Sequence, residues 1–277
     1  VILDCKVEHG LHGAKIMLAF PSVGATENIM LAAVTAEGVT EIHNAAQEPE
    51  IVDLAGYLTK RGAKIRDAGK STVYIEGVKS LHGAEYTVMP DRIVTATYLA
   101  GAAATGGEVT VRHVVPSDLE SVLPIFDQAG CKMRIWQDAI RLEGPGMLHA
   151  VRNIRTLPYP GFPTDAQAPV MAVLTVASGT SVFVETIFEN RYKHAGELCR
   201  MGADIKIEGK VAVVRGVKKL YGANVRATDL RGGAALVVAG LAAEGKTRIS
   251  DVVHIDRGYE SIEQAFSALG AQIRRER

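Results

Sequence analysis

Four loops in the sequence place polar side chains directly before an apolar helix pattern, where a helix N-terminus can carry chemistry. They are "FPSVGATE" at 20–27, "MPDRI" at 89–93, "FPTDAQ" at 162–167 and "ATDLRGG" at 227–233. Three of these loops hold an acid at the equivalent place: Asp91, Asp165 and Asp229. A carboxylate there can act as a general base, but Asp is also a preferred N-cap residue. The sequence leaves both roles open for each acid.

The loop that contains Asp165 is the stiffest of the four. "PGFPTDAQAP" at 160–169 holds three prolines, which reduce the entropy lost when the loop is fixed. Thr164 and Gln167 fit the Thr-x-x-Gln capping box. Pro169 lacks the N–H that would bond to the carbonyl of Asp165. The pattern therefore predicts a helix with an irregular start and Asp165 in its first turn.

The loop at 20–27 has a different character, because it offers backbone N–H groups and a hydroxyl but no acid ahead of the helix. Ser22, Val23 and Gly24 stand at its start, and the glycine allows a close approach. This arrangement suits a phosphate or another oxygen-rich ligand at a helix N-terminus.

A second row of loops precedes a second set of helices. These are "NAAQEPE" at 44–50, "VPSD" at 115–118, "IFENRYKH" at 187–194 and "HIDRGYE" at 254–260. Arg191 and Arg257 are candidate anion ligands, since the guanidinium fork matches carboxylates and phosphates. The alternative for each is a surface ion pair with its neighbour Glu189 or Asp256, which contributes little.

These loops recur because the chain repeats one unit four times. "LHGA" at 11–14 and 81–84 returns as "LHA" at 148–150 and "LYGA" at 220–223. Glycines at 62, 130, 202 and 270 keep the same phase, as do "EGVTEI", "GGEVTV", "SGTSVF" and "EGKTRI". Three markers in phase over four copies of about 70 residues indicate internal repeats.

Each unit is predicted to be βαβαββ. The first helix is apolar nearly all round, which indicates burial, and a glycine is expected just past its end. The second helix is amphipathic and is expected nearer the surface. Buried helices with sheets outside them predict a compact pseudo-symmetric domain rather than an open solenoid, for which such a unit is long.

Composition narrows the class of protein. The 277 residues include 31 Lys+Arg and 31 Asp+Glu, so no net charge favours nucleic acid or an anionic membrane surface. No stretch is long and apolar enough to span a bilayer, and the N-terminus has no signal-peptide pattern. Cys5, Cys131 and Cys199 are too widely spaced for a disulfide framework or a zinc knuckle. We expect a reduced cytosolic protein with two cores.

Taken together, the motifs resemble those of the bacterial UDP-N-acetylglucosamine enolpyruvyl transferases. The resemblance covers essentially the whole chain and rests on "FPSVGATENIMLAAV", "NAAQEPEIVDLA", "PGFPTDAQA", "ETIFENRYKH", "ATDLRGGAALVVAGL" and "HIDRGYESIE". It implies an α/β (α+β) fold, the inside-out barrel of repeated βαβαββ units in two domains. Residues 1–89 would be the last unit of one domain. Residues 90–277 would form the second domain, with units 90–147, 148–219 and 220–277.

The resemblance also implies an activity and an acceptor site. Family members transfer the enolpyruvyl group of phosphoenolpyruvate to the 3-hydroxyl of UDP-N-acetylglucosamine, with release of phosphate, in cytoplasmic peptidoglycan synthesis. Asp165 corresponds to the general base and to a contact of the sugar nucleotide. Ser22, Val23 and Gly24 correspond to the loop on the UDP portion.

Further residues match the family's substrate contacts. Ile187 and Phe188 correspond to the wall beside the uridine and sugar, and Asp229 to an acid close to the reacting centre. Arg231 and Arg257 correspond to arginines that bind phosphoenolpyruvate. The resemblance implies no metal, no cofactor and a monomer, with the two small-molecule substrates as the only partners.

Two departures from the family pattern change what is expected. Family chains begin upstream of Val1, with a lysine–asparagine pair and a mobile loop that carries an arginine and a reactive cysteine. We therefore expect this chain to be the C-terminal part and inactive alone. Phe20 stands where many members have a lysine. Two alternatives remain: a shikimate-pathway enolpyruvyl transferase, and a non-catalytic UDP-sugar-binding protein of the same fold.

Overall fold

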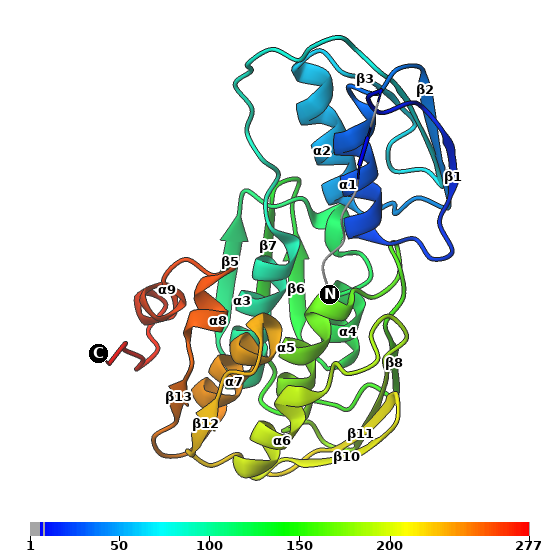
Figure 1. Ribbon diagram of the computed structural model, residues 1–277. Helices are drawn as coiled ribbons and strands as arrows, with labels where there is room; N and C mark the ends of the chain where they lie inside the picture. The colour runs from blue at the N-terminus through cyan, green and yellow to red at the C-terminus, as the bar shows by residue number, and fades with distance from the viewer. Residues whose placement is uncertain (1–5, 8, 277) are drawn as a thin grey trace. The chain divides into compact units, whose positions relative to one another are not determined.

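The computed structural model describes residues 6, 7 and 9–276, and the chain divides into two compact units (Figure 1). Unit 1 comprises residues 1–89 and 158–160, and unit 2 comprises residues 90–157 and 161–277. Cys5 lies outside the described residues.

Unit 1 contains one complete βαβαββ copy. Its sheet has the order β1 (Lys15–Met17), β2 (Val39–His43), β4 (Thr72–Glu76), β3 (Lys64–Arg66), and its helices are α1 (Val23–Ala33) and α2 (Pro49–Lys60). β1 runs parallel to β2, whereas β4 runs antiparallel to both of its neighbours. Apolar residues of both helices and of the inner sheet face form the core, among them Met30, Ile42 and Ile75.

Unit 2 contains the other three copies. The first has α3 (Arg92–Thr105), β5 (Glu108–Arg112), a 3₁₀ turn (Pro116–Leu119), α4 (Leu123–Gln128), β6 (Lys132–Ile135) and β7 (Ala139–Glu143). The next has β8 (Asn153–Arg155), α5 (Thr164–Leu174), β9 (Thr180–Val184), α6 (Lys193–Arg200), β10 (Asp204–Glu208) and β11 (Val211–Arg215). The last has β12 (Asn224–Arg226), α7 (Leu230–Ala242), β13 (Arg248–Ser250), α8 (Val253–Asp256) and α9 (Ile262–Ala268).

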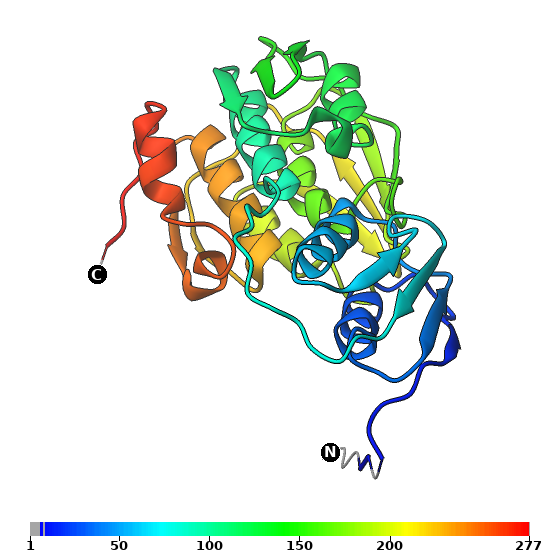
Figure 2. The same cartoon turned by 90° about the horizontal axis from the view of Figure 1, so that it is seen from above.

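The predicted inside-out arrangement is confirmed in unit 2. Helices α3, α5 and α7 contact one another side by side, and the sheets lie outside them (Figures 1 and 2). Most residues of these three helices are buried, because each helix packs against two others and against strands. Helix α1 departs from the prediction, with only Thr26, Met30 and Ala33 buried. In the described part of unit 1, no second helix of the α1 type packs against α1.

The prediction of βαβαββ holds for the first and third copies. In the second copy it is wrong for the strand expected at 85–88, after the LHGA turn, where the chain still belongs to unit 1 and forms no strand. Tyr86 instead donates to Asp53 Oδ1 at 2.9 Å, and its ring packs edge-on against Tyr57 of α2. Side-chain contacts with a helix therefore hold this segment in place of a strand ladder.

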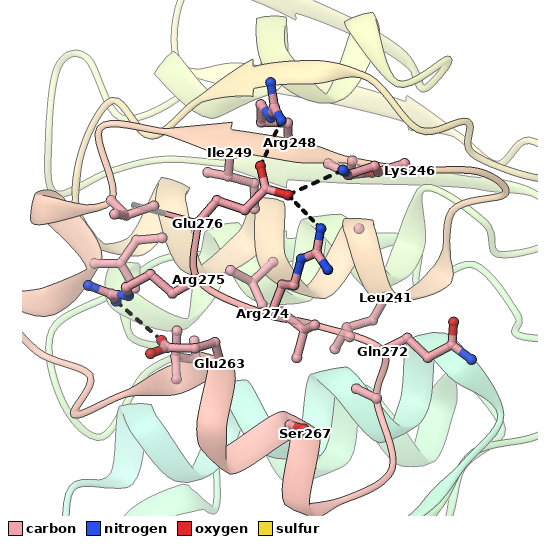
Figure 3. Close-up of a pocket in the computed structure, with 18 of the residues that line it drawn as sticks. Leu241, Lys246, Arg248, Ile249, Glu263, Ser267, Gln272, Arg274, Arg275 and Glu276 are labelled. Atoms are coloured by element: carbon pink, nitrogen blue, oxygen red, sulfur yellow. Dashed lines mark hydrogen bonds and ion pairs between the residues drawn. The ribbon is translucent and has the colours of Figure 1, made fainter.

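In the fourth copy, residues 271–276 correspond to the first closing strand of the other copies and form no strand. β12 and β13 pair only with each other, and a cavity of about 950 Å³ lies beside β13 and residues 271–276 (Figure 3). Glu276 contacts Arg248, Arg274 and Lys246 there, at 2.7, 3.0 and 3.3 Å. Hydrogen bonds from these three cations lower the pKa of Glu276 to about 2. Ion pairs thus lie where each of the other copies has its first closing strand.

The phased glycines of the sequence follow the second helix of each copy. Gly62, Gly130, Gly202 and Gly270 all have φ between 94° and 99°. Each lies one residue past the helix C-cap, and the next N–H bonds back to a carbonyl of the last turn. This is the left-handed helix end that glycine favours. The first helices differ from prediction, since only α3 ends directly at a glycine, Gly106.

Candidate active site

The three equivalent acids have two different roles. Asp91 is the N-cap of α3 and accepts two backbone N–H bonds of its first turn, at 2.8 and 2.9 Å. Asp229 is the N-cap of α7 and accepts one such bond at 2.8 Å. Asp165 is not a cap, because α5 has Pro163 at its N-cap and Asp165 lies in the first turn. The capping alternative is therefore confirmed for two acids and wrong for Asp165.

The carboxylate of Asp165 faces two guanidinium groups. Its Oδ1 accepts a hydrogen bond from Arg191 Nη2, and its Oδ2 lies 3.6 Å from Arg231 Nη2. The side chain of Asp165 is 42% exposed, whereas Arg191 and Arg231 are 20% and 13% exposed. Two partly buried cations on one accessible carboxylate leave an excess positive charge, which is suited to an anionic ligand.

Arg231 is held from behind by a buried hydroxyl pair. Its Nη1 donates to the Tyr259 hydroxyl at 3.3 Å, and that hydroxyl lies 2.8 Å from Thr97 Oγ1. Burial alone would lower the pKa of Arg231, but the charge of Asp165 and the contact with Tyr259 outweigh burial and raise it. Arg231 therefore stays cationic, with most of its donors unused by Tyr259.

Arg191 pairs with Asp165 and not with its sequence neighbour Glu189, so the predicted surface pair is wrong. Its guanidinium also lies over the ring of Phe188, 5.1 Å from the centroid. Phe188 is 48% exposed, and Ile187 beside it is partly exposed. The structure thus brings the 187–188 segment and the first turn of α5 to one place.

A buried carboxylate that the sequence reasoning missed lies beneath these groups. Glu185, at the end of β9, is 1% exposed. It accepts hydrogen bonds from Thr164 Oγ1 at 2.9 Å and from Gln167 Nε2 at 2.7 Å. The predicted capping box is therefore wrong, because both of its side chains bond to Glu185 instead of to the helix backbone. Only the acid before "TIFEN" hinted at this contact.

Arg257 lies at the end of α8 and is exposed. The predicted pair with Asp256 is wrong, since Asp256 bonds to both nitrogens of the Arg275 fork at 2.6 and 2.9 Å. Among the residues that the structure describes, the side chain of Arg257 makes no hydrogen bond or ion pair. Its donors are available to a ligand.

A second buried group that the sequence reasoning missed is His194, at the start of α6 beside α7. The side chain packs against Gly232 of α7: a Cβ built on Gly232 would lie 3.0 Å from the Cβ of His194. The ring is fully buried, and neither nitrogen has a hydrogen-bond partner in the described part of the chain. Burial lowers the pKa of His194 to about 4; the negative charge of Asp229 opposes this shift, and the positive charge of Arg191 adds to it. The ring is therefore neutral at pH 7.

Because His194 is buried and neutral, we expect the free energy of unfolding to fall in acid. The pKa of histidine is 6.5 before the shift, so between pH 6.5 and about 4 the unfolded chain binds a proton that the folded chain does not. Stability is full above pH 6.5 and falls as the pH drops through this window, by roughly 3 kcal/mol. We expect His194→Phe to remove this part of the pH dependence. Urea unfolding of both proteins at pH 7.5 and pH 4.5 measures it, and equal losses would contradict the assignment.

Ser22, Val23 and Gly24 lie in unit 1, at the N-terminus of α1. Ser22 is the N-cap, and its Oγ accepts the N–H of Ala25 at 3.3 Å. A Cβ built on Gly24 would meet nothing within 4 Å, so the glycine faces open space. This helix start is accessible, as a ligand contact requires.

Metal and thiol chemistry find little support in the described residues. No group of three or more His, Cys, Asp or Glu side chains there could hold a metal ion. Burial raises the pKa of the Cys131 thiol to about 11, whereas Cys199 is exposed.

No helix within the described ranges is long and apolar enough to cross a bilayer. None of the predicted site residues lines the cavity of Figure 3.

Comparison with known proteins relates this geometry to a family. Residues 2–266 match the family model of EPSP synthase, 3-phosphoshikimate 1-carboxyvinyltransferase. UDP-N-acetylglucosamine 1-carboxyvinyltransferase 1 of Caldanaerobacter subterraneus is 57% identical over 98% of this chain and 67% of its own length. The enzyme of the same name from Symbiobacterium thermophilum is 54% identical over 99% of this chain and 62% of its own length. The chain thus spans about two thirds of the relatives it matches.

Solved structures agree on the fold. The enolpyruvyl transferase NikO from Streptomyces tendae matches 96% of this chain and 66% of its own, with a TM-score of 0.86 and 25% identity. An EPSP synthase from Acinetobacter baumannii matches 96% of this chain and 64% of its own, at a TM-score of 0.71 and 20% identity, which supports the fold alone. The chain therefore belongs to the EPSP synthase family of carboxyvinyltransferases, and within it to the UDP-N-acetylglucosamine 1-carboxyvinyltransferases.

Proposed function

We propose that this chain carries much of the site that transfers the enolpyruvyl group of phosphoenolpyruvate to the 3-hydroxyl of UDP-N-acetylglucosamine. The observation that carries the proposal is the accessible carboxylate of Asp165 between the cations of Arg191 and Arg231. A base beside two cations suits the joining of a hydroxyl to a polyanion. The names of the relatives support this reaction, and the chain covers about two thirds of the length of those relatives.

The reaction proceeds by addition and then elimination. The sugar 3-oxygen bonds to C2 of phosphoenolpyruvate while its proton passes to a base and C3 gains a proton. A tetrahedral ketal results. C3 then loses a proton, the bond between C2 and the phosphate oxygen breaks, and inorganic phosphate leaves with the enolpyruvyl ether as product. Atoms and electrons balance without an oxidant or a cofactor.

The residues of unit 2 take the parts that this reaction needs. Asp165 accepts the proton of the sugar hydroxyl, and a positioned base contributes about 10²–10⁴ in rate. Arg231 and Arg257 bind the anionic groups of phosphoenolpyruvate through guanidinium donors that the protein leaves unused. Asp229 is the acid close to the reacting centre; its Oδ1 accepts the N–H of Gly232, and its Oδ2 lies 3.4 Å from the Thr228 hydroxyl.

Further residues contact the sugar nucleotide. Ser22, Val23 and Gly24 offer an open helix N-terminus to the UDP portion. Ile187 and Phe188 supply an exposed apolar wall for the uridine and the sugar. Asp165 holds the sugar while it acts as the base.

The proposal also covers the domains, the location and the assembly of the protein. Residues 1–89 are the last repeat unit of one domain, and 90–277 form a second domain of three units. The protein works in the cytoplasm as a monomer without a cofactor. Its product enters peptidoglycan synthesis, and through the cell wall it affects cell shape and division.

Phosphate release is the test. Phosphoenolpyruvate is offered with UDP-N-acetylglucosamine or with shikimate 3-phosphate, to this chain alone and to a protein that carries it at the full length of its relatives. Release that depends on the UDP-sugar supports the proposal. Release with shikimate 3-phosphate instead would favour the activity that names the family model. Binding of the UDP-sugar without turnover by either protein would indicate a binding protein.

A further inference from the structure

We propose that Glu185 is a positioning residue that fixes Asp165 relative to the 187–188 wall. This inference rests on the proposed function for its kinetic consequence, but its structural part does not. Glu185 touches no accessible surface and so cannot meet a substrate itself. It acts through the residues it binds.

Five donors converge on this one buried carboxylate. Oε1 accepts from Thr156 Oγ1 at 2.9 Å and from the backbone N–H groups of Ile187 at 2.7 Å and Phe188 at 3.0 Å. Oε2 accepts from Thr164 Oγ1 and Gln167 Nε2. A carboxylate oxygen accepts hydrogen bonds, so each of these five donors has its acceptor in Glu185.

These bonds replace a helix cap. Helices α3 and α7 are capped locally by Asp91 and Asp229, whereas α5 has no side-chain cap bond. Glu185 binds the first turn of α5 from the end of β9 instead, through Thr164 and Gln167. The acid at the equivalent place, Asp165, is thereby left for Arg191 and Arg231.

The contacts close into a ring around the site. Glu185 binds the backbone of Phe188, the ring of Phe188 lies under Arg191, and Arg191 pairs with Asp165. Asp165 follows Thr164, which binds Glu185 again. The distance between Asp165 and the 187–188 wall therefore depends on Glu185, a carboxylate that is itself buried.

Two substitutions test the hydrogen bonds of Glu185. Glu185→Ala leaves five donors without this acceptor, two of them on the buried residues Thr156 and Gln167. Glu185→Gln keeps the shape, and its amide group fits on the Oε2 side, because the Thr164 hydroxyl can turn to accept. Gln167 can likewise turn its Oε1, which has no partner in the described part of the chain. The turn at 187–188 then keeps its carbonyl acceptor.

The test has one arm without substrate and one with it. Residue-resolved amide exchange of Ile187 and Phe188 is measured in this chain. Steady-state kcat and KM are measured in whichever length of the protein releases phosphate. For Glu185→Ala we expect exchange at least about tenfold faster. We also expect kcat lower by about 10²-fold from a misplaced base, and a raised KM for the UDP-sugar but not for phosphoenolpyruvate. Glu185→Gln should stay within about threefold of the parent in each quantity.

Leu142→Ala, in the fully buried core of β7, controls for lost stability. It should lower the melting temperature comparably while leaving exchange at 187–188 and the KM split unchanged. Unchanged exchange in Glu185→Ala, or faster exchange with unchanged kinetics, overturns the positioning role. A parent protein without activity at either length overturns the proposed function instead, and the exchange arm then still decides whether Glu185 holds the turn.

Discussion

Replacing Asp165 by alanine is expected to lower kcat for enolpyruvyl transfer by about 10²–10⁴-fold while the fold is retained. The carboxylate is accessible and caps no helix, so its loss removes no backbone hydrogen bond. Arg191 and Arg231 lose a counter-ion, but both lie near solvent and can be solvated. Phosphate release at saturating substrates, together with urea unfolding, measures both quantities. Asp165→Asn should fall as far, since an amide cannot take the proton.

Two other acids near helix N-termini serve as controls. Asp91→Ala removes a true cap and should cost about 1 kcal/mol of stability with less than about tenfold loss of kcat. Glu263→Ala removes an acid that also pairs with an arginine, Arg275, but lies at α9, so kcat should not change. An Asp165→Ala protein that keeps its kcat, or loses no more than Asp91→Ala, would remove the general base from the proposed mechanism.

The fold was predictable as far as local signals reach. Phase-keeping glycines identified four repeats because a left-handed helix end depends on the residue itself, and the structure has such an end at Gly62, Gly130, Gly202 and Gly270. Strands at 85–88 and at 271–276 were predicted by analogy between copies, and the structure has no strand at these residues. A strand needs a partner at its edge, and a single repeat does not encode that partner.

The site residues could be predicted where the residue type itself indicates a chemical role. The acid in a stiff loop and the arginines were found in this way, although the sequence could not distinguish capping from ion pairing. Asp91, Asp165 and Asp229 share one place in the repeat, and only the long-range contact of Glu185 with α5 gives Asp165 a different role. Glu185, His194 and Tyr259 were missed because burial and partners distant in sequence define them.

The second large effect is expected at Arg231. Arg231→Gln should lower kcat/KM for phosphoenolpyruvate by about 10²–10³-fold, because a preorganised cation at an anion site is lost. Arg231→Lys should recover only part of this loss, since a point charge lacks the guanidinium fork. Initial rates against phosphoenolpyruvate concentration at saturating UDP-sugar separate an effect on KM from one on kcat.

The hydrogen bond from Arg231 to Tyr259 allows a smaller effect to be compared with that of Arg231→Gln. Tyr259→Phe removes the hydroxyl that meets Arg231 Nη1 and Thr97, but keeps the ring 5.8 Å below the guanidinium. A smaller loss, about three- to tenfold in kcat/KM, is expected from that single neutral hydrogen bond. Arg226→Gln, at a 70% exposed arginine paired with Asp251, should change neither constant. If Arg231→Gln lowers only the unfolding free energy and leaves kcat/KM for phosphoenolpyruvate intact, the pair of Arg231 with Asp165 is structural. The anion site must then be sought at Arg257 and Arg191.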